Sequence, residues 1–162
     1  MSDHHSEPAL RAARASSLRR ELRMLCRGRG VYASDLTARL GPLLKEHLGN
    51  ARGDHGSRAR LIAMLTPQIE ALPQDLALVA RVALGLHEGT RQRFLRDRLD
   101  WLAGRMARDA RTVRRRLDES LDLLAETIEH GPATAPPPHG APRTGARPRC
   151  LSGAAHRPPR RH

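Results

Sequence analysis

Aromatic side chains and lysine are almost absent from this chain. Its 162 residues include one Tyr, one Phe and one Trp, and among the 29 lysines and arginines only Lys45 is a lysine. β-Sheets draw on aromatic and β-branched side chains, so the scarcity of both argues against a sheet protein. Leucine and alanine supply most of the apolar side chains, which favours an aliphatic core built from helices. We therefore predict an all-α protein.

Cysteine is rare, and no cluster of metal ligands is evident. The two cysteines, Cys26 and Cys150, lie far apart and give neither a disulfide framework nor metal-ligand spacing. No two of the nine histidines sit one helical turn apart in a region that we expect to fold. We therefore expect reduced thiols, no metal and no cofactor.

Enzyme signatures and long apolar runs are missing as well. The sequence contains no nucleophile with a plausible base, no glycine-rich nucleotide loop and no paired carboxylates in an apolar setting. We therefore predict a protein without catalytic activity and without a small-molecule ligand. No apolar run approaches the ~20 residues that span a membrane, and the N-terminus lacks the apolar core of a signal peptide. We expect a cytoplasmic protein with no membrane partner.

What the chain has in excess is positive charge. Its formal net charge is +12, and half of this excess lies in residues 132–162, which contain six arginines and no acidic residue. A strongly basic chain favours polyanionic partners, namely nucleic acid, an anionic membrane surface or an acidic protein. The bias to arginine, alanine, glycine and proline is also typical of a GC-rich coding sequence, so charge alone does not identify the partner.

The composition divides the chain into three parts. Residues 1–16 are polar and alanine-rich, and we predict a disordered N-terminus there. Residues 17–131 carry leucines at helical spacing, which predicts a single multi-helix domain of about six helices. Residues 132–162 are rich in Pro and Arg and cannot bury enough apolar surface to offset their chain entropy, so we predict a disordered tail. A second interpretation of the tail is degenerate sequence that follows a truncated domain.

Apolar spacing and breaker residues locate the helices of this domain. We expect Ser34 to cap a short helix, Pro42 to open another, and Pro67 to kink or restart a longer one. The most hydrophobic stretch, 74–87, is placed at the centre of the core. The helices are predicted over residues 14–27, 35–40, 42–48, 58–72, 74–87, 91–105 and 110–130.

Residues 102–117, LAGRMARDARTVRRRL, are the most informative stretch of the domain. They are predicted to form a helix, a tight turn and a second helix. Asp109 stands at the N-cap position of the second helix, where its carboxylate can accept a backbone N–H that would otherwise be unpaired. The helical repeat places Val113 and Leu117 on an apolar inner face of this helix. It places Arg111 and Arg115 on a basic outer face.

This segment resembles the helix-turn-helix domains of bacterial, actinobacterial-type transcription regulators. The matching positions are Leu102, Ala103, Met106, Asp109, Thr112, Val113, Arg115 and Leu117. The sequence differs from the usual pattern at Ala107, where the turn usually has glycine, and at Arg108, where a small apolar residue usually packs. The resemblance implies a C-terminal helix-turn-helix over about residues 94–130, double-stranded DNA as the partner and a role in transcription regulation.

The residue types also fit recognition of the major groove. That groove admits one α-helix, and the N-terminal part of the helix reaches the base edges. Arginine can donate to both major-groove acceptors of guanine, so Arg111 and Arg115 are the predicted base-reading residues. Arg108, Thr112 and Arg114 flank that face and are predicted to contact phosphates. We predict a DNA-binding protein that regulates transcription.

The charge order of the last helix leaves a second function open. The first half of helix 110–130 carries four arginines and no acid, and its second half carries five acids, an order that opposes the helix dipole. Pairs such as Arg114–Asp118 and Arg115–Glu119 would neutralise this face. Alternatively, the basic half could meet the acidic half of a second copy in an antiparallel homodimer. The alternative function is a non-enzymatic interaction module, an adaptor or dimerisation domain, whose charged last helix docks on a protein.

Two further basic segments, the RGRG stretch and the tail, give no specific evidence of a binding site. The stretch RGRG at residues 27–30 is predicted to be a helix-ending loop, because as a phosphate-binding loop it lacks the spacing and the lysine of a P-loop. The arginines of the tail either add sequence-independent affinity for nucleic acid through counterion release or are incidental.

Overall fold

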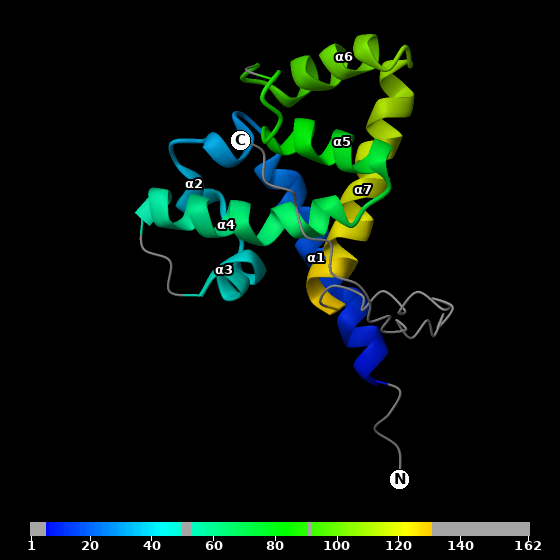
Figure 1. Ribbon diagram of the computed structural model, residues 1–162. Helices are drawn as coiled ribbons and strands as arrows, with labels where there is room; N and C mark the ends of the chain where they lie inside the picture. Colours follow the sequence, from blue (N-terminus) through cyan, green and yellow to red (C-terminus); the bar gives the residue numbers. More distant parts are fainter. Residues whose placement is uncertain (1–5, 50–52, 91, 131–162) are drawn as a thin grey trace, which may run out of the picture.

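The computed structural model describes residues 6–49, 53–90 and 92–130, and within these ranges every regular element is helical. The elements are α1 (Ser6–Leu25), the 3-10 turn η1 (Gly30–Tyr32), α2 (Leu36–Arg39), α3 (Pro42–Leu48), α4 (Gly53–Glu70), α5 (Gln74–Leu84), α6 (Leu95–Arg105) and α7 (Ala110–His130), as Figure 1 shows. The prediction of a single all-α domain is confirmed. None of the described helices has the length and apolar character to cross a membrane. The tail predicted over 132–162 lies outside the described residues.

The two longest helices, α1 and α7, pack against each other (Figure 1). Arg14 pairs with Glu129, and Arg23 pairs with Asp118, so the two helices run antiparallel. The leucines whose spacing predicted α1 are fully buried on its inner face: Leu18, Leu22 and Leu25. Burial of these leucines holds α1 against α7.

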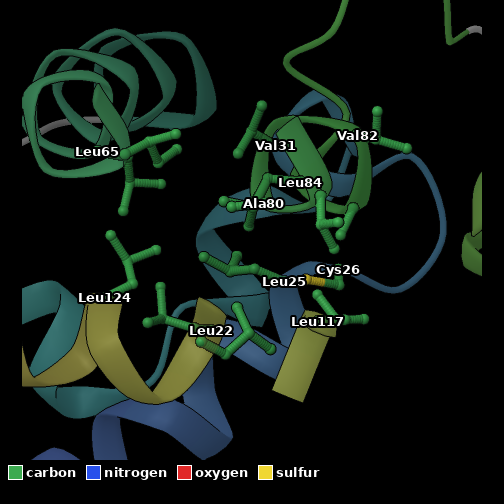
Figure 2. Packing of buried hydrophobic residues seen from close by; sticks show 14 of the residues in the cluster. Leu22, Leu25, Cys26, Val31, Leu65, Ala80, Val82, Leu84, Leu117 and Leu124 are labelled. Atoms are coloured by element: carbon green, nitrogen blue, oxygen red, sulfur yellow. The ribbon is translucent and has the colours of Figure 1, made fainter. Parts of the chain in front are cut away.

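Helix α5 lies at the centre of the core, as the sequence predicts. It packs against η1, α4, α6 and α7, and most of its side chains are buried. Figure 2 shows Ala80 and Leu84 of α5 near Leu25 of α1 and Leu117 of α7. Among the described residues the buried cluster contains no aromatic side chain, so the prediction of an aliphatic core is also confirmed.

The short helices α2 and α3 are capped by side chains from distant elements. Glu21 of α1 accepts the backbone N–H groups of Leu43 and Leu44 at 3.1 and 2.9 Å. Asp54 of α4 accepts the N–H of Thr37 in α2 at 2.7 Å. The expected cap, Ser34, does not begin α2, because the helix starts one residue later and takes its cap from α4. Tertiary contacts therefore replace the local capping that the sequence suggested.

Four helix boundaries differ from the sequence prediction by three residues or more. Helix α6 begins at Leu95 and not at residue 91, because Phe94 has an extended backbone. Helix α1 begins at Ser6 and so includes most of the segment that was predicted to be disordered, because alanine and arginine are strong helix formers even where the helix is exposed. Helix α4 begins at Gly53 and continues through Pro67, since Leu65 and Ile69 on either side are buried in the core. Helix α5 ends at Leu84, because the following glycine adopts a left-handed conformation.

Arg98 is a buried cation that joins three segments of the chain. Its side chain is 1% exposed, and its guanidinium donates to six backbone carbonyls at 2.7–3.2 Å. The acceptors are Cys26, Gly28, Val82, Ala83, Gln92 and Arg93. Four of these carbonyls follow or end α1 and α5, where a helix carries partial negative charge. Burial lowers the pKa of Arg98, yet an arginine remains charged in proteins and the carbonyl cage compensates the charge.

The RGRG loop passes too close to α5 for any side chain at its last glycine. Gly30 has a φ of 63°, and a Cβ atom there would lie 2.1 Å from the carbonyl oxygen of Leu84. The loop therefore follows the end of α1, as predicted, and its glycine serves the close approach of two backbones. Together with Arg98, this contact fixes the start of α6 relative to α1 and α5.

Candidate nucleic-acid interface

Helix α6 ends in a compact turn that leads directly into α7. The N–H of Ala107 donates to the carbonyl of Gly104 at 3.3 Å, and the N–H of Arg108 donates to that of Ala103 at 3.0 Å. This pair of hydrogen bonds is the Schellman arrangement, which requires a left-handed residue after the helix. Ala107 is that residue, with a φ of 49°, and it is the only non-glycine residue with positive φ in the described chain. The turn is thus well formed although alanine stands where glycine is usual.

Asp109 caps α7 from the N-cap position. Its carboxylate accepts the N–H of Thr112 at 2.8 Å and the hydroxyl of Thr112 at 2.7 Å. These two bonds, the hydroxyl first, lower the pKa of Asp109. The start of α7 lies where the sequence places it. The Thr112 hydroxyl donates its proton to Asp109, so in this arrangement it positions the helix and has no proton left to donate to a phosphate.

The first two turns of α7 separate an apolar face from a basic one. Val113 and Leu117 are each 1% exposed and pack in the core, whereas Arg111 and Arg115 are exposed. Arg114 and the turn residue Arg108 are exposed as well. We call these four arginines the α7 basic face: Arg108, Arg111, Arg114 and Arg115. Figure 1 shows this end of α7 at the periphery of the molecule, beside the end of α6.

Three of the five acids in the second half of α7 are neutralised by α1. Asp118 pairs with Arg19 and Arg23, and Asp122 pairs with Arg19 at 2.7 Å. In the last turn of the helix, the side chain of Glu129 is 6% exposed and accepts from Arg14 at 2.8 Å. Burial raises the pKa of Glu129, but the bonds from Arg14 and His47 outweigh burial and lower it. These acids therefore have a structural role in the seam between the two helices.

The basic first half of α7 has no such compensation. Arg116 pairs with Asp75 of α5, but none of the other three arginines on this half forms an ion pair within the described residues. The i,i+4 pairs that would join Arg114 to Asp118 and Arg115 to Glu119 are absent there, and Asp118 is instead bound by α1. The charge order of α7 thus has a structural explanation in its acidic half only.

One further cation borders this face, and sequence reasoning did not single it out. Arg105, in the last turn of α6, is exposed, and its guanidinium carbon lies 5.6 Å from the centre of the Trp101 ring. Its position three residues before Arg108 is the sequence feature that could have placed it beside the basic face. Glu119 is also exposed, one turn beyond Arg115, and it limits the uninterrupted positive surface to the turn and the start of α7.

Cys26 and the potential metal ligands of the described ranges do not form a reactive site. Cys26 is buried, and burial raises the pKa of its thiol to about 12, so it does not provide a thiolate at neutral pH. No group of three or more His, Cys, Asp or Glu side chains in this part of the chain is arranged to hold a metal ion. Comparison with protein-family models, curated proteins and solved structures gives no match to the chain.

Proposed function

We propose that the protein binds double-stranded DNA through the α7 basic face and regulates transcription. The observation that carries the proposal is the selective pairing of charges on α7. The acids Asp118, Asp122 and Glu129 and the arginine Arg116 are bound within the chain, while the arginines of the basic face are exposed and unpaired in the described structure. Exposed arginines next to one another repel, so their clustering suits a polyanionic partner.

In the proposed complex the N-terminal turns of α7 enter the major groove. Arg111 and Arg115 lie on one face about 6 Å apart along the helix axis, given ~1.5 Å per residue. This separation is similar to two base-pair steps of ~3.4 Å, so the two guanidinium groups can donate to guanines on base pairs two steps apart. Arg108 and Arg114 flank them and contact phosphates, which fixes the register of the helix on the duplex.

Sequence preference is the property that tests this proposal. The full chain is used to select duplexes from a random library, and Kd is measured for the enriched sequence and for a scrambled one. Each bidentate contact between arginine and guanine contributes about 1–3 kcal/mol of discrimination. The double variant Arg111→Ala/Arg115→Ala should therefore lose most of the preference for the enriched sequence.

The matched control removes the same charge elsewhere. Arg11→Ala/Arg20→Ala deletes two exposed arginines of α1, which lie outside the basic face. It should lower affinity for both duplexes alike and leave their ratio unchanged. A selection without any enriched sequence, or a preference that survives the Arg111/Arg115 substitutions, would contradict the proposal. If the unmodified full chain binds no DNA at all, the result would favour the alternative, a helical module that binds an acidic protein.

A further inference from the structure

Two of the three aromatic side chains of the protein are on its surface. Tyr32 in η1 is 52% exposed, and Phe94, just before α6, is 59% exposed, although the core is otherwise aliphatic. Both line the same open cleft of about 470 Å³, which lies between the RGRG loop and the start of α6. A protein that buries its leucines but exposes its aromatic rings in one cleft uses those rings for something other than folding.

The cleft is positively charged. Its lining includes three arginines, Arg29, Arg39 and Arg93, and a single acid, Asp35. Asp35 accepts from Arg39 at 2.8 Å, and Arg39 also donates to the carbonyl of Arg27 at 3.2 Å, so this arginine is already bound. Arg29 and Arg93 are exposed and form no ion pair within the described residues. Neither cation is therefore neutralised by an acid in the described structure, and the guanidinium carbon of Arg93 lies 5.6 Å from the centre of the Phe94 ring.

The Tyr32 ring is held in place by a structural arginine. Arg58 of α4 donates to the carbonyls of Val31 and Ala33 at 3.0 Å each, and its guanidinium carbon lies 5.9 Å from the centre of the Tyr32 ring. These bonds fix the η1 backbone on both sides of Tyr32. A residue whose backbone is fixed before binding loses less entropy when a ligand stacks on its ring.

An adjoining cavity offers an unsatisfied acceptor. This second cavity, of about 450 Å³, shares Arg29 and Tyr32 with the first, and Gln92 also lines it. The Oε1 atom of Gln92 is buried and accepts no hydrogen bond from the described residues. A buried carbonyl without a donor is unfavourable, because it has lost its hydrogen bonds to water. A ligand that carries an N–H donor at its edge would satisfy it.

We propose that this cleft binds a nucleotide, either free or as part of a single strand. The base stacks on Tyr32 or Phe94, as bases do on exposed aromatic side chains in single-strand-binding proteins. The phosphate is bound by Arg29 and Arg93 through charge-assisted hydrogen bonds. The cleft volume falls in the range of about 300–1,000 Å³ that is usual for small-ligand sites. Sequence analysis predicted no such ligand, because the aromatic and basic residues of the cleft come from separate parts of the chain.

The site is separate from the α7 basic face. It lies at the start of α6, whereas the basic face begins at the end of that helix (Figure 1). It therefore does not rest on the proposed function, and the two can fail independently. Variants of the cleft should keep any preference for a duplex sequence, and the Arg111→Ala/Arg115→Ala variant should keep nucleotide binding.

Isothermal titration of the full chain tests the ligand chemistry. The probes are the nucleoside monophosphates, the corresponding nucleosides, inorganic phosphate and a single-stranded tetranucleotide. Nucleotides should bind at least about tenfold more tightly than nucleosides or phosphate alone, since the stacked base and the bound phosphate both contribute to affinity. If the monophosphate and the tetranucleotide bind with similar affinity, the ligand is a free nucleotide. If the tetranucleotide binds much more tightly, the ligand is a single strand.

Four substitutions test the site itself. Tyr32→Leu and Phe94→Leu each remove a stacking surface. The substitution that removes the ring on which the base stacks should weaken nucleotide binding about tenfold. Arg29→Gln and Arg93→Gln should weaken nucleotides but not nucleosides. The control Arg20→Gln removes an exposed arginine of α1 and should change nothing. Circular dichroism verifies that each variant is folded. Absence of nucleotide binding at millimolar concentration, or binding that all four variants retain, would overturn the inference.

Discussion

At the residue scale, Arg98 has the largest structural role of any charged side chain in the described protein. Its guanidinium is surrounded by carbonyl oxygens and by no carboxylate. Such an arrangement suits arginine, which offers five N–H donors in a rigid planar group, whereas lysine offers three on a flexible stem. The residue fixes the start of α6, and therefore supports both the α7 basic face and the Tyr32–Phe94 cleft.

Substitution of Arg98 should be strongly destabilising. Arg98→Met leaves six carbonyls without their donor, and each buried acceptor that stays unsatisfied costs about 1–3 kcal/mol, so the loss should exceed that of a single hydrogen bond. Arg98→Lys should lower the free energy of unfolding by a smaller but clear amount, since lysine satisfies fewer of the acceptors. Urea denaturation followed by circular dichroism measures both.

The neighbouring arginine provides the control for this prediction. Arg96 is exposed on the same helix, where its guanidinium lies 3.6 Å from Asp100. An exposed pair of this kind contributes at most about 1 kcal/mol, so Arg96→Met should change stability little. A similar, small effect of both substitutions would mean that the carbonyls around Arg98 find other donors.

The sequence gives no signal for Arg98, although it predicts the apolar core well. The leucines of α1 repeat at helical spacing, so their burial follows from the pattern alone. Arg98, by contrast, is one arginine among many in the stretch RFLRDRLD, and only the folded backbone shows that six carbonyls converge on it. The same holds for Tyr32 and Phe94, whose shared cleft depends on tertiary contacts between the η1 loop and the start of α6.

At the scale of elements, long amphipathic helices with clear end signals are predicted best. The start of α7 is set by the Asp109 cap, and its predicted bounds agree with the structure. The short helices are predicted less well, since their caps come from Glu21 and Asp54 on other helices. Local sequence specifies an element when its hydrogen bonds are local, and it does not when distant side chains supply them.

The turn between α6 and α7 leads to a prediction about two small residues. Gly104 lies inside α6, where a Cβ atom would meet nothing within 4 Å, whereas Ala107 adopts a left-handed conformation. Glycine costs about 1 kcal/mol inside a helix but accepts the left-handed conformation without strain. The exchange Gly104→Ala/Ala107→Gly should therefore stabilise the protein by roughly 1–2 kcal/mol, with each substitution contributing. Thermal and urea denaturation provide the measurement.

Exchange of the two residues leaves the amino-acid composition unchanged, so any effect arises from position. Gly56 in α4 is a useful comparison, since it is another helical glycine with open space around a Cβ atom. Gly56→Ala should stabilise by an amount similar to Gly104→Ala alone. Destabilisation by Ala107→Gly would show that residue 107 does not occupy the left-handed region.

At the scale of the whole molecule, the pairing of charges between α1 and α7 decides where positive charge remains. Three acids of α7, Asp118, Asp122 and Glu129, pair with Arg14, Arg19 and Arg23 of α1. An antiparallel homodimer through the two halves of α7 has only the exposed Glu119 and Glu126 available unless these pairs break, so it gains little from electrostatics. Arginines without an ion pair in the described structure include those at the two ends of α6, in the cleft and on the α7 basic face.

The dependence of DNA affinity on salt should separate this surface from the arginine-rich tail. Each phosphate neutralised by a protein cation contributes about −0.9 to the slope of log K against log salt concentration. A chain limited to residues 1–131 presents the two phosphate-contacting arginines of the α7 basic face, Arg108 and Arg114, and should give a slope of about −2 with its sequence preference intact. The full chain adds six arginines from residues 132–162, which lie outside the described structure, and its slope should steepen toward about −7 without a gain in preference. Fluorescence anisotropy with enriched and scrambled duplexes over a salt series measures both quantities. If binding disappears with the tail, the affinity resides in residues 132–162, and α7 is not the recognition helix.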